Sequence, residues 1–163
     1  YPNCPNPPKS LSFLNQTPLL IEMPKRLGGD MSKSLPCVRE GCSICCRETT
    51  MPLTAAEASR LERRTGMKED QFCSKDEEGI RRLLNNESTL ACVFLATNSK
   101  EKYAPGLCSV YDSRPKGCRT FPIVLNDEDN AILDDLCPHT SEFDEPTEED
   151  ALSLLNLEAK LKL

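Results

Sequence analysis

The stretch "GCSICCR", residues 41–47, places three cysteines within seven residues of this sequence. Two residues separate Cys42 from Cys45, which lets both thiolates turn onto one metal ion, and Cys37 can close the same loop from upstream. Cys46 directly follows Cys45. Neighbouring side chains on an extended loop diverge, so we expect Cys46 to serve a second metal or to remain a free thiol. Further ligands are expected from the downstream cysteines Cys92, Cys108, Cys118 and Cys137.

Metal ligation and disulfide formation are the two alternatives for the ten cysteines of the chain. An even number of cysteines and the N-x-S/T matches at Asn15 and Asn86 are typical of secreted, disulfide-bonded chains. The length of 163 residues, the lack of a secretion-signal pattern and the Lys/Glu-rich helical stretches favour metal. We therefore expect thiol-bound metal in a reducing compartment inside the cell, the cytoplasm or an organelle interior, with a disulfide-stapled protein as the alternative.

Zinc and an iron–sulfur cluster are both compatible with the cysteine spacing. Thiolates select such soft or borderline metals over magnesium or calcium. Structural zinc sites commonly take two C-x2-C pairs, and this chain has one clean pair, Cys42-x2-Cys45. Cys37-x4-Cys42-x2-Cys45, followed by a distant cysteine, reproduces the spacing of plant-type iron–sulfur ligation, and Cys137-Pro138 matches the Cys-Pro ending of another ferredoxin run. The spacing alone leaves zinc and iron open.

Four blocks of sequence occur in the order "CVREGCSICCR", "CVFL", "LCSVYDSRPKGCRTFP" and "CPH" between residues 37 and 139. In this order they resemble the zinc- or iron-chelating cysteine-cluster family (YkgJ-like), over about two-thirds of the chain. Cys4 and Cys73 fall outside the family pattern. The resemblance implies a cysteine-ligated zinc or iron–sulfur centre, and it implies these ligands: Cys37, Cys42, Cys45, Cys46, Cys92, Cys108, Cys118 and Cys137.

An enzyme is the alternative to a binding module, because some relatives of this family are described as flagellin lysine N-methylases. The resemblance thus implies a methylase-like or redox enzyme as a second hypothesis. The chain lacks a G-x-G-x-G loop and a radical-type C-x3-C-x2-C. His139 is the only histidine; it lies beside Cys137 and could bind metal, but we favour an unliganded role. We expect no catalytic residues, and a metal-binding accessory or structural/redox module within a larger assembly.

The net charge of the chain indicates whether it can bind nucleic acid. The formal net charge is −6, with 26 acidic and 20 basic residues, which argues against binding to nucleic acid. No apolar run approaches the length of about 18 to 20 residues that a membrane span needs. Arg47, Arg114 and Arg119 lie beside or between cysteines, where we expect guanidinium groups to offset the negative charge of thiolates.

The supply of apolar side chains is thin for one domain, since 38% of the residues are hydrophobic and there is no Trp. A fold with so little core needs a further source of stability, which a metal bound by distant cysteines provides. We expect a small α+β or mostly α domain, irregular and rich in loops, with short helices and few short strands around a cysteine-ligated, metal-stapled centre.

Local signals predict several elements. Thr54 and Glu57 have capping-box spacing and Gly66 is a stop signal, so we expect a helix between them with Ala58 and Leu61 facing the core. The other expected elements are a short helix over 75–86, a strand or extended segment over 89–96, a strand over 121–125, and a terminal amphipathic helix that is capped near Thr147 and faces inward with Leu152, Leu155 and Leu161.

The chain divides into three expected regions. Residues 1–36 hold seven of the thirteen prolines and are expected to form an extended arm or a leader, whose leucines could dock on a protein partner. Residues 37–140 are expected to form the cysteine-cluster metal-binding domain. Residues 141–163 are expected to form an acidic linker and the C-terminal amphipathic helix.

Overall fold

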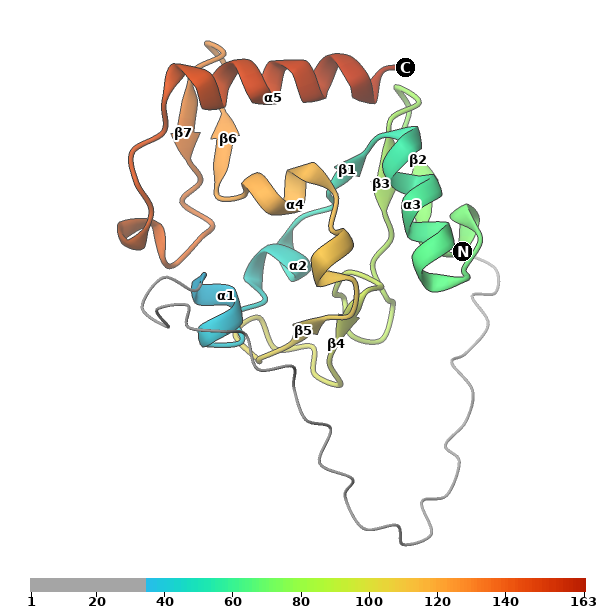
Figure 1. The fold of residues 1–163 in the computed structure, drawn as a ribbon. Coiled ribbons are helices and arrows are strands. Elements are labelled where there is room, and N and C mark those ends of the chain that lie inside the picture. The colour runs from blue at the N-terminus through green and yellow to red at the C-terminus, as the bar shows by residue number, and fades with distance from the viewer. Residues whose placement is uncertain (1–34) are drawn as a thin grey trace, which may run out of the picture. The chain divides into compact units, whose positions relative to one another are not determined.

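Short helices and short antiparallel strands alternate along residues 35–163, the part of the chain that the computed structural model describes (Figure 1). This confirms the expected small, loop-rich α+β class, whereas the expected arm over 1–36 lies almost entirely outside the described residues. The helices are α1 (Pro36–Arg39), α2 (Ile44–Glu48), α3 (Ala55–Thr65), α4 (Lys116–Thr120) and α5 (Glu148–Leu161). The strands are β1 (Pro52–Leu53), β2 (Cys73–Lys75), β3 (Arg81–Leu83), β4 (Leu95–Ala96), β5 (Leu107–Cys108), β6 (Ile123–Leu125) and β7 (Ala131–Leu133).

Helix α3 forms where the capping signals predicted it. The Thr54 hydroxyl accepts a hydrogen bond from the Glu57 backbone N–H, and the Glu57 carboxylate accepts one from the Thr54 backbone N–H. The helix ends at Gly66, which has a φ of 74° and so occupies the left-handed region that favours glycine. Ala58 and Leu61 are buried, as predicted.

The helix predicted over 75–86 is wrong, because this segment forms the hairpin of β2 and β3. The Asp76 carboxylate accepts hydrogen bonds from the backbone N–H groups of Glu78 and Ile80. Gly79, with a φ of 78°, completes the reversal of the chain. This turn takes the place of the expected helix. Strand β3 pairs with β2 on one edge and with β1 on the other, which gives the order β1–β3–β2.

The main hydrophobic core forms around α3 and this three-stranded sheet. Leu53, Leu61 and Phe72 are completely buried, and the Phe72 ring packs on Phe94 with 5.5 Å between ring centroids. Three cysteines border the core and pack against it while partly exposed: Cys92, Cys108 and Cys118. The edge of the core is therefore lined with thiols.

Two further hairpins complete the sheet structure. The segment predicted as a strand over 89–96 contributes β4, which pairs with β5, and Cys92 forms an isolated bridge with Asn85. The strand predicted over 121–125 forms as β6 (Ile123–Leu125) and pairs with β7, a partner that we did not predict. Figure 1 shows the N-terminal part of α5 crossing the β6–β7 hairpin, and the helix contacts both strands.

Helix α5 is capped by Thr147, as predicted, but its buried face differs in part from the one that we expected. Its buried leucines are Leu154, Leu157 and Leu161, which confirms Leu161. Leu155 is partly buried, and Leu152 is 61% exposed, so the expected inward role of Leu152 is wrong. Leu157 and Leu161 pack on Ile80 from the turn between β2 and β3. Of the helices in residues 35–163, none combines the length and the apolar character needed to cross a membrane.

Candidate metal centre

Cys37 lies on α1, and Cys45 and Cys46 lie on α2, where we had expected an extended loop; Cys42 lies in the segment between the two helices. Gly41, between α1 and α2, has a φ of 66°, and its carbonyl accepts a hydrogen bond from the Gly106 N–H at 3.1 Å. A Cβ atom at position 41 would lie 3.3 Å from Pro105 Cβ, so both the backbone conformation and the close approach favour glycine here. Helix α2 then carries Cys45 and Cys46 at adjacent positions of one turn.

Three segments that are distant in sequence meet near α2. The backbone N–H of Cys92 donates a hydrogen bond to the Cys46 carbonyl at 2.6 Å. Leu95, three residues later, pairs with Cys108 across the β4–β5 hairpin. Cys118 lies on α4, which contacts β1, the strand that follows α2. Backbone pairing and helix packing therefore position these cysteines.

Four thiols, which we call the inner thiols, interact electrostatically in every pairing: Cys45, Cys46, Cys92 and Cys118. The Cys46 thiol donates a hydrogen bond to the Cys45 sulfur, which lowers the pKa of Cys45 to about 7 although burial opposes this. The same hydrogen bond, followed by burial, raises the pKa of Cys46. Burial raises the pKa of Cys92 to about 11 and also raises the pKa of Cys118. Ionising all four thiols together is unfavourable without a cation.

The other four expected ligands, which we call the outer thiols, form an adjoining group: Cys37, Cys42, Cys108 and Cys137. Burial raises the pKa of Cys37, Cys108 and Cys137, and the negative charge of Cys45 adds to each increase. The charge of Cys42 also acts on Cys137. All eight cysteines that the family resemblance implied thus lie in one connected group.

Cys73 lies apart from this group. It is buried in the main core, and its thiol donates a hydrogen bond to the Ser74 carbonyl at 3.7 Å. Burial raises its pKa, and the charges that act on it come from Glu69, Arg81 and Lys75. Cys4 lies outside the described residues. Within residues 35–163 all nine cysteines are free thiols, so no disulfide supports the alternative of a disulfide-stapled fold there.

Arg114 supplies positive charge beside the thiols. Its guanidinium carbon lies 3.6 Å from the centroid of the Tyr111 ring, and its Nε donates to the Tyr111 carbonyl at 2.8 Å. Of the two other arginines expected in this role, Arg119 is exposed and Arg47 has other partners. Burial raises the pKa of three thiols, and the Arg114 charge opposes the increase in each: Cys37, Cys108 and Cys118.

A protein-family model matches the cysteine-rich part of the chain. The family is CxxCxxCC, with the description "Putative zinc- or iron-chelating domain", and the match covers residues 36–138, which include all inner and outer thiols. The chain belongs to this family. The match confirms the family that the sequence blocks suggested. Its description names zinc and iron as the two candidate metals, as the resemblance implied. The comparisons with curated proteins and with solved structures gave no match.

Arg47 of the CxxCxxCC domain is buried, with 8% of its surface exposed, and it bonds to a loop and not to thiols. Its Nε donates to Ser43 Oγ at 3.1 Å and its Nη1 donates to the Ser99 carbonyl at 2.7 Å. Its Nη2 donates to Thr97 Oγ1 at 3.0 Å and to the Ala104 carbonyl at 3.2 Å. The guanidinium group therefore fastens the loop after β4 to α2.

We expect Arg47→Ala to lower the free energy of unfolding by about 3 kcal/mol, because buried carbonyl and hydroxyl groups lose a charged donor. Urea denaturation of the metal-bound protein measures this change. The matched control is Arg63→Ala on the exposed surface of α3, which should change the free energy by no more than about 0.5 kcal/mol. An Arg47→Ala variant as stable as this control would contradict the role that we assign to Arg47.

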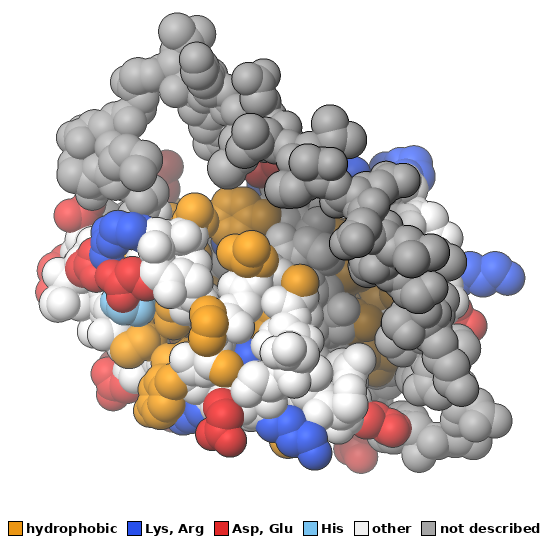
Figure 2. Space-filling view, turned by 90° about the horizontal axis from the view of Figure 1, so that it is seen from below, with side chains coloured by type: hydrophobic (Ala, Val, Ile, Leu, Met, Phe, Trp, Pro, Cys, Tyr) orange, Lys and Arg blue, Asp and Glu red, His pale blue; other side chains and the backbone are white. Residues whose placement is uncertain are grey.

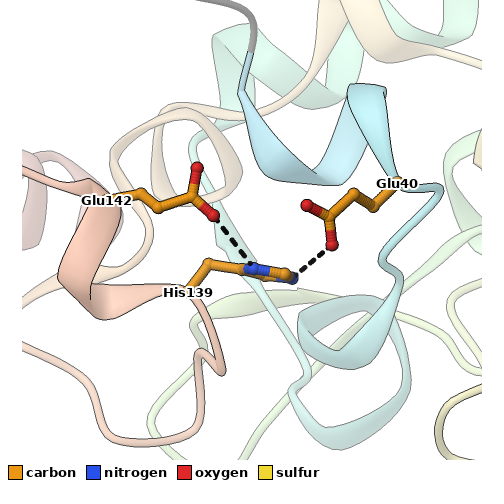
Figure 3. Close-up of side chains that lie close together, drawn as sticks. All are labelled: Glu40, His139 and Glu142. Carbon is orange, nitrogen blue, oxygen red and sulfur yellow. Dashed lines mark ion pairs between the residues drawn. The ribbon is translucent and has the colours of Figure 1, made fainter.

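A second group of metal-type ligands adjoins the thiols, formed by Glu40, His139 and Glu142 (Figure 3). Glu40 Oε2 lies 3.7 Å from His139 Nε2, and Glu142 Oε1 lies 3.4 Å from His139 Nδ1. One donor atom from each residue lies within 4.8 Å of the other two, a closeness that no three thiols of residues 35–163 reach. Sequence reasoning considered His139 but missed both glutamates, because no spacing pattern links Glu40, which follows α1, to Glu142 in the 3-10 turn Thr140–Glu142.

Proposed function

We propose that this CxxCxxCC domain is a structural metal-binding module whose inner and outer thiols hold zinc or iron. One observation carries the proposal: eight cysteines from separate segments form one electrostatically connected group, and all eight are free thiols. Free thiols gathered in this way are unfavourable for each other once ionised, because each thiolate raises the pKa of its neighbours. A bound cation turns this repulsion into attraction.

The chemistry of the donor set fits the proposed metal. Thiolate sulfur binds zinc and iron–sulfur clusters well, and the Arg114 guanidinium contributes a compensating positive charge from the edge of the group. Four thiolates bound to one zinc ion at about 2.3 Å lie roughly 3.8 Å apart. No three thiols of residues 35–163 lie within 4.8 Å of one another, so we expect their side chains to move together when metal binds. The bound metal supplies a crosslink between these segments.

We infer a division of the eight ligands from their electrostatic pairings. Cys45, Cys46, Cys92 and Cys118 each interact with the other three, as expected of a four-ligand set, and Cys108, which interacts with Cys45, Cys92 and Cys118, is the alternative to Cys46. The outer thiols form the second set. This division differs from our expectation that Cys42 and Cys45 share one metal and that Cys46 serves a second metal or remains a free thiol.

The proposed centre stabilises the fold by joining α2, the segment around Cys92 and α4. Each of these elements is short, and α4 contains no fully buried residue. An accessory role in a larger assembly, in a reducing compartment of the cell, is part of the proposal. Leu90, Tyr103 and Leu107 are large exposed hydrophobic side chains that could contact such a partner.

Metal analysis of the chain, purified anaerobically, tests the proposal. We expect about two zinc ions per chain and a colourless protein, or iron with inorganic sulfide and broad visible absorption. Thiol titration of the native protein should find the inner and outer thiols protected while the metal is bound. A protein that contains neither metal and whose cysteines are paired in disulfides would contradict the proposal.

A further inference from the structure

Two short segments lie side by side at the edge of the thiol group. Each carries a cysteine two positions away from a residue with an oxygen or nitrogen donor. Glu40 and Cys42 lie on one segment, and Cys137 and His139 lie on the other. Burial raises the pKa of Cys137 and the charge of Cys42 adds to it, while Glu40 Oε2 lies 3.7 Å from His139 Nε2. Glutamate therefore faces histidine at this edge, and each of the two segments also carries a cysteine.

Arg39 orients the two carboxylates of the harder group. Its Nη2 donates to Glu40 Oε1 at 2.9 Å and to Glu142 Oε2 at 2.6 Å. The remaining oxygens, Glu40 Oε2 and Glu142 Oε1, are the ones that face the His139 ring. Each carboxylate thus accepts a hydrogen bond from the guanidinium with one oxygen and directs the other oxygen at the imidazole. Hydrogen bonds from neighbouring groups orient the ligands of metal sites in the same way.

We propose that Glu40, His139 and Glu142 bind a divalent zinc-like metal ion at a solvent-facing site that is separate from the thiol-bound metal. The single histidine of the chain, pale blue in Figure 2, reaches the surface beside acidic and basic side chains. Glu40 and His139 also line a pocket of about 290 Å³, together with Cys42 and the exposed Tyr103. The pocket provides access for the ion and room for water as a further ligand.

The donors match such an ion in charge and in number. Two carboxylates and one guanidinium leave a net charge of −1 around a neutral imidazole, so a dication is attracted to the group. Imidazole and carboxylate are ligands for zinc and related divalent metals, and zinc sites with three protein ligands keep a position open to water. An imidazole binds a metal ion through one nitrogen, and the two carboxylates face different nitrogens. One carboxylate must therefore rotate toward the other before the three donor atoms, which lie within 4.8 Å of one another, can surround one ion.

The competing explanation is a plain ion-pair network, in which a protonated His139 sits between the two carboxylates and no metal binds. The proposal and this explanation differ in one measurable respect, the uptake of a metal ion that has no sulfur ligand. Cobalt(II) is a suitable probe, because thiolate ligands give it a strong sulfur-to-metal charge-transfer band that imidazole and carboxylate ligands do not.

The experiment is equilibrium dialysis of the purified holoprotein against Co²⁺, with metal analysis and an absorption spectrum of each sample. We expect the wild-type chain to take up about one Co²⁺ ion without sulfur charge transfer. His139→Ala and the double variant Glu40→Gln/Glu142→Gln should both lose this ion and keep their thiol-bound metal. The matched control, Glu77→Gln/Glu78→Gln on the exposed β2–β3 turn, should bind it as the wild type does.

Two results would overturn the proposal. Equal uptake by the wild type and by both site variants would leave the three residues with no role in binding. Loss of the sulfur-bound metal in His139→Ala would make His139 a ligand of the thiol centre and not of a separate site. Failure of the thiol proposal gives a different result, namely a chain without sulfur-bound metal that still takes up the Co²⁺ ion in a His139-dependent manner.

Discussion

Cys45→Ser is expected to strip the thiol-bound metal from the chain and to unfold residues 35–163. The charge of Cys45 acts on six of the other seven thiols, so its removal affects both ligand groups. Structural zinc contributes about 10 to 16 kcal/mol of binding free energy in small zinc-dependent folds. A typical domain has a total stability of only about 5 to 15 kcal/mol. Elemental analysis and far-UV circular dichroism measure the two effects.

Cys73→Ser is the matched control for this variant, since it removes a thiol that lies apart from the group. Cys73 is 5% exposed, so a serine hydroxyl there should lower the free energy of unfolding by about 1 to 3 kcal/mol. The metal content should not change. A Cys45→Ser protein with normal metal content, or a Cys73→Ser protein without metal, would show that our assignment of the ligands is wrong.

We expect Cys46→Ser to remove the metal of the inner thiols as completely as Cys45→Ser does. Cys46 donates a hydrogen bond to the Cys45 sulfur, and it interacts with Cys92 and Cys118 as well. If Cys46 were a free thiol, its replacement would leave the metal content unchanged. The measurement is the amount of metal per chain, together with the absorption of the sulfur-bound metal.

Cys137→Ser, in the outer group, provides the comparison for Cys46→Ser. It should lower the metal content by about half, because one four-ligand set stays intact. The far-UV spectrum should then keep most of its native intensity, since the inner thiols still join α2 to α4. The opposite pattern, with Cys137→Ser losing all metal and Cys46→Ser losing none, would show that our division into inner and outer sets is wrong.

Elements with complete local signals could be predicted from the sequence. Helix α3 has both halves of its capping box and a terminal glycine within one short stretch, and α5 has the same box at Thr147 and Asp150. In both helices the side chain and the backbone that stabilise the end are three residues apart, so no tertiary contact is needed to recognise them. The choice of the buried face of α5 did need such contacts, and Leu152 was misassigned.

The hairpin over 73–83 was missed because its apolar residues also suit a helix. What decides the conformation is the Asp76 turn and the pairing of β3 with β1, which lies far upstream. The short helix α2 was missed for a related reason. A helix of five residues is too short to be stable alone, and here the Cys92 N–H and the Arg47 side chain fix it to segments from elsewhere in the chain.

The ligand candidates show the same division between local and distant information. The eight cysteines could be named from the sequence because the family blocks carry them in order, and the structure places them in one group. How the eight divide between metals depends on which thiols face each other, and spacing does not specify that. Glu40 and Glu142 carry no recognisable pattern, since only the folded chain brings them to opposite edges of the His139 ring.

The distance in sequence between the inner thiols has a consequence for the growing polypeptide. Translation adds about 5 to 20 residues per second, so the stretch from Cys46 to Cys118 takes about 4 to 14 seconds to make. During that interval the nascent chain presents two adjacent thiols, Cys45 and Cys46, whose ligand set is incomplete. They are then open to oxidation and to capture by the wrong ion. Correct loading of the inner set is therefore expected only after α4 has left the ribosome.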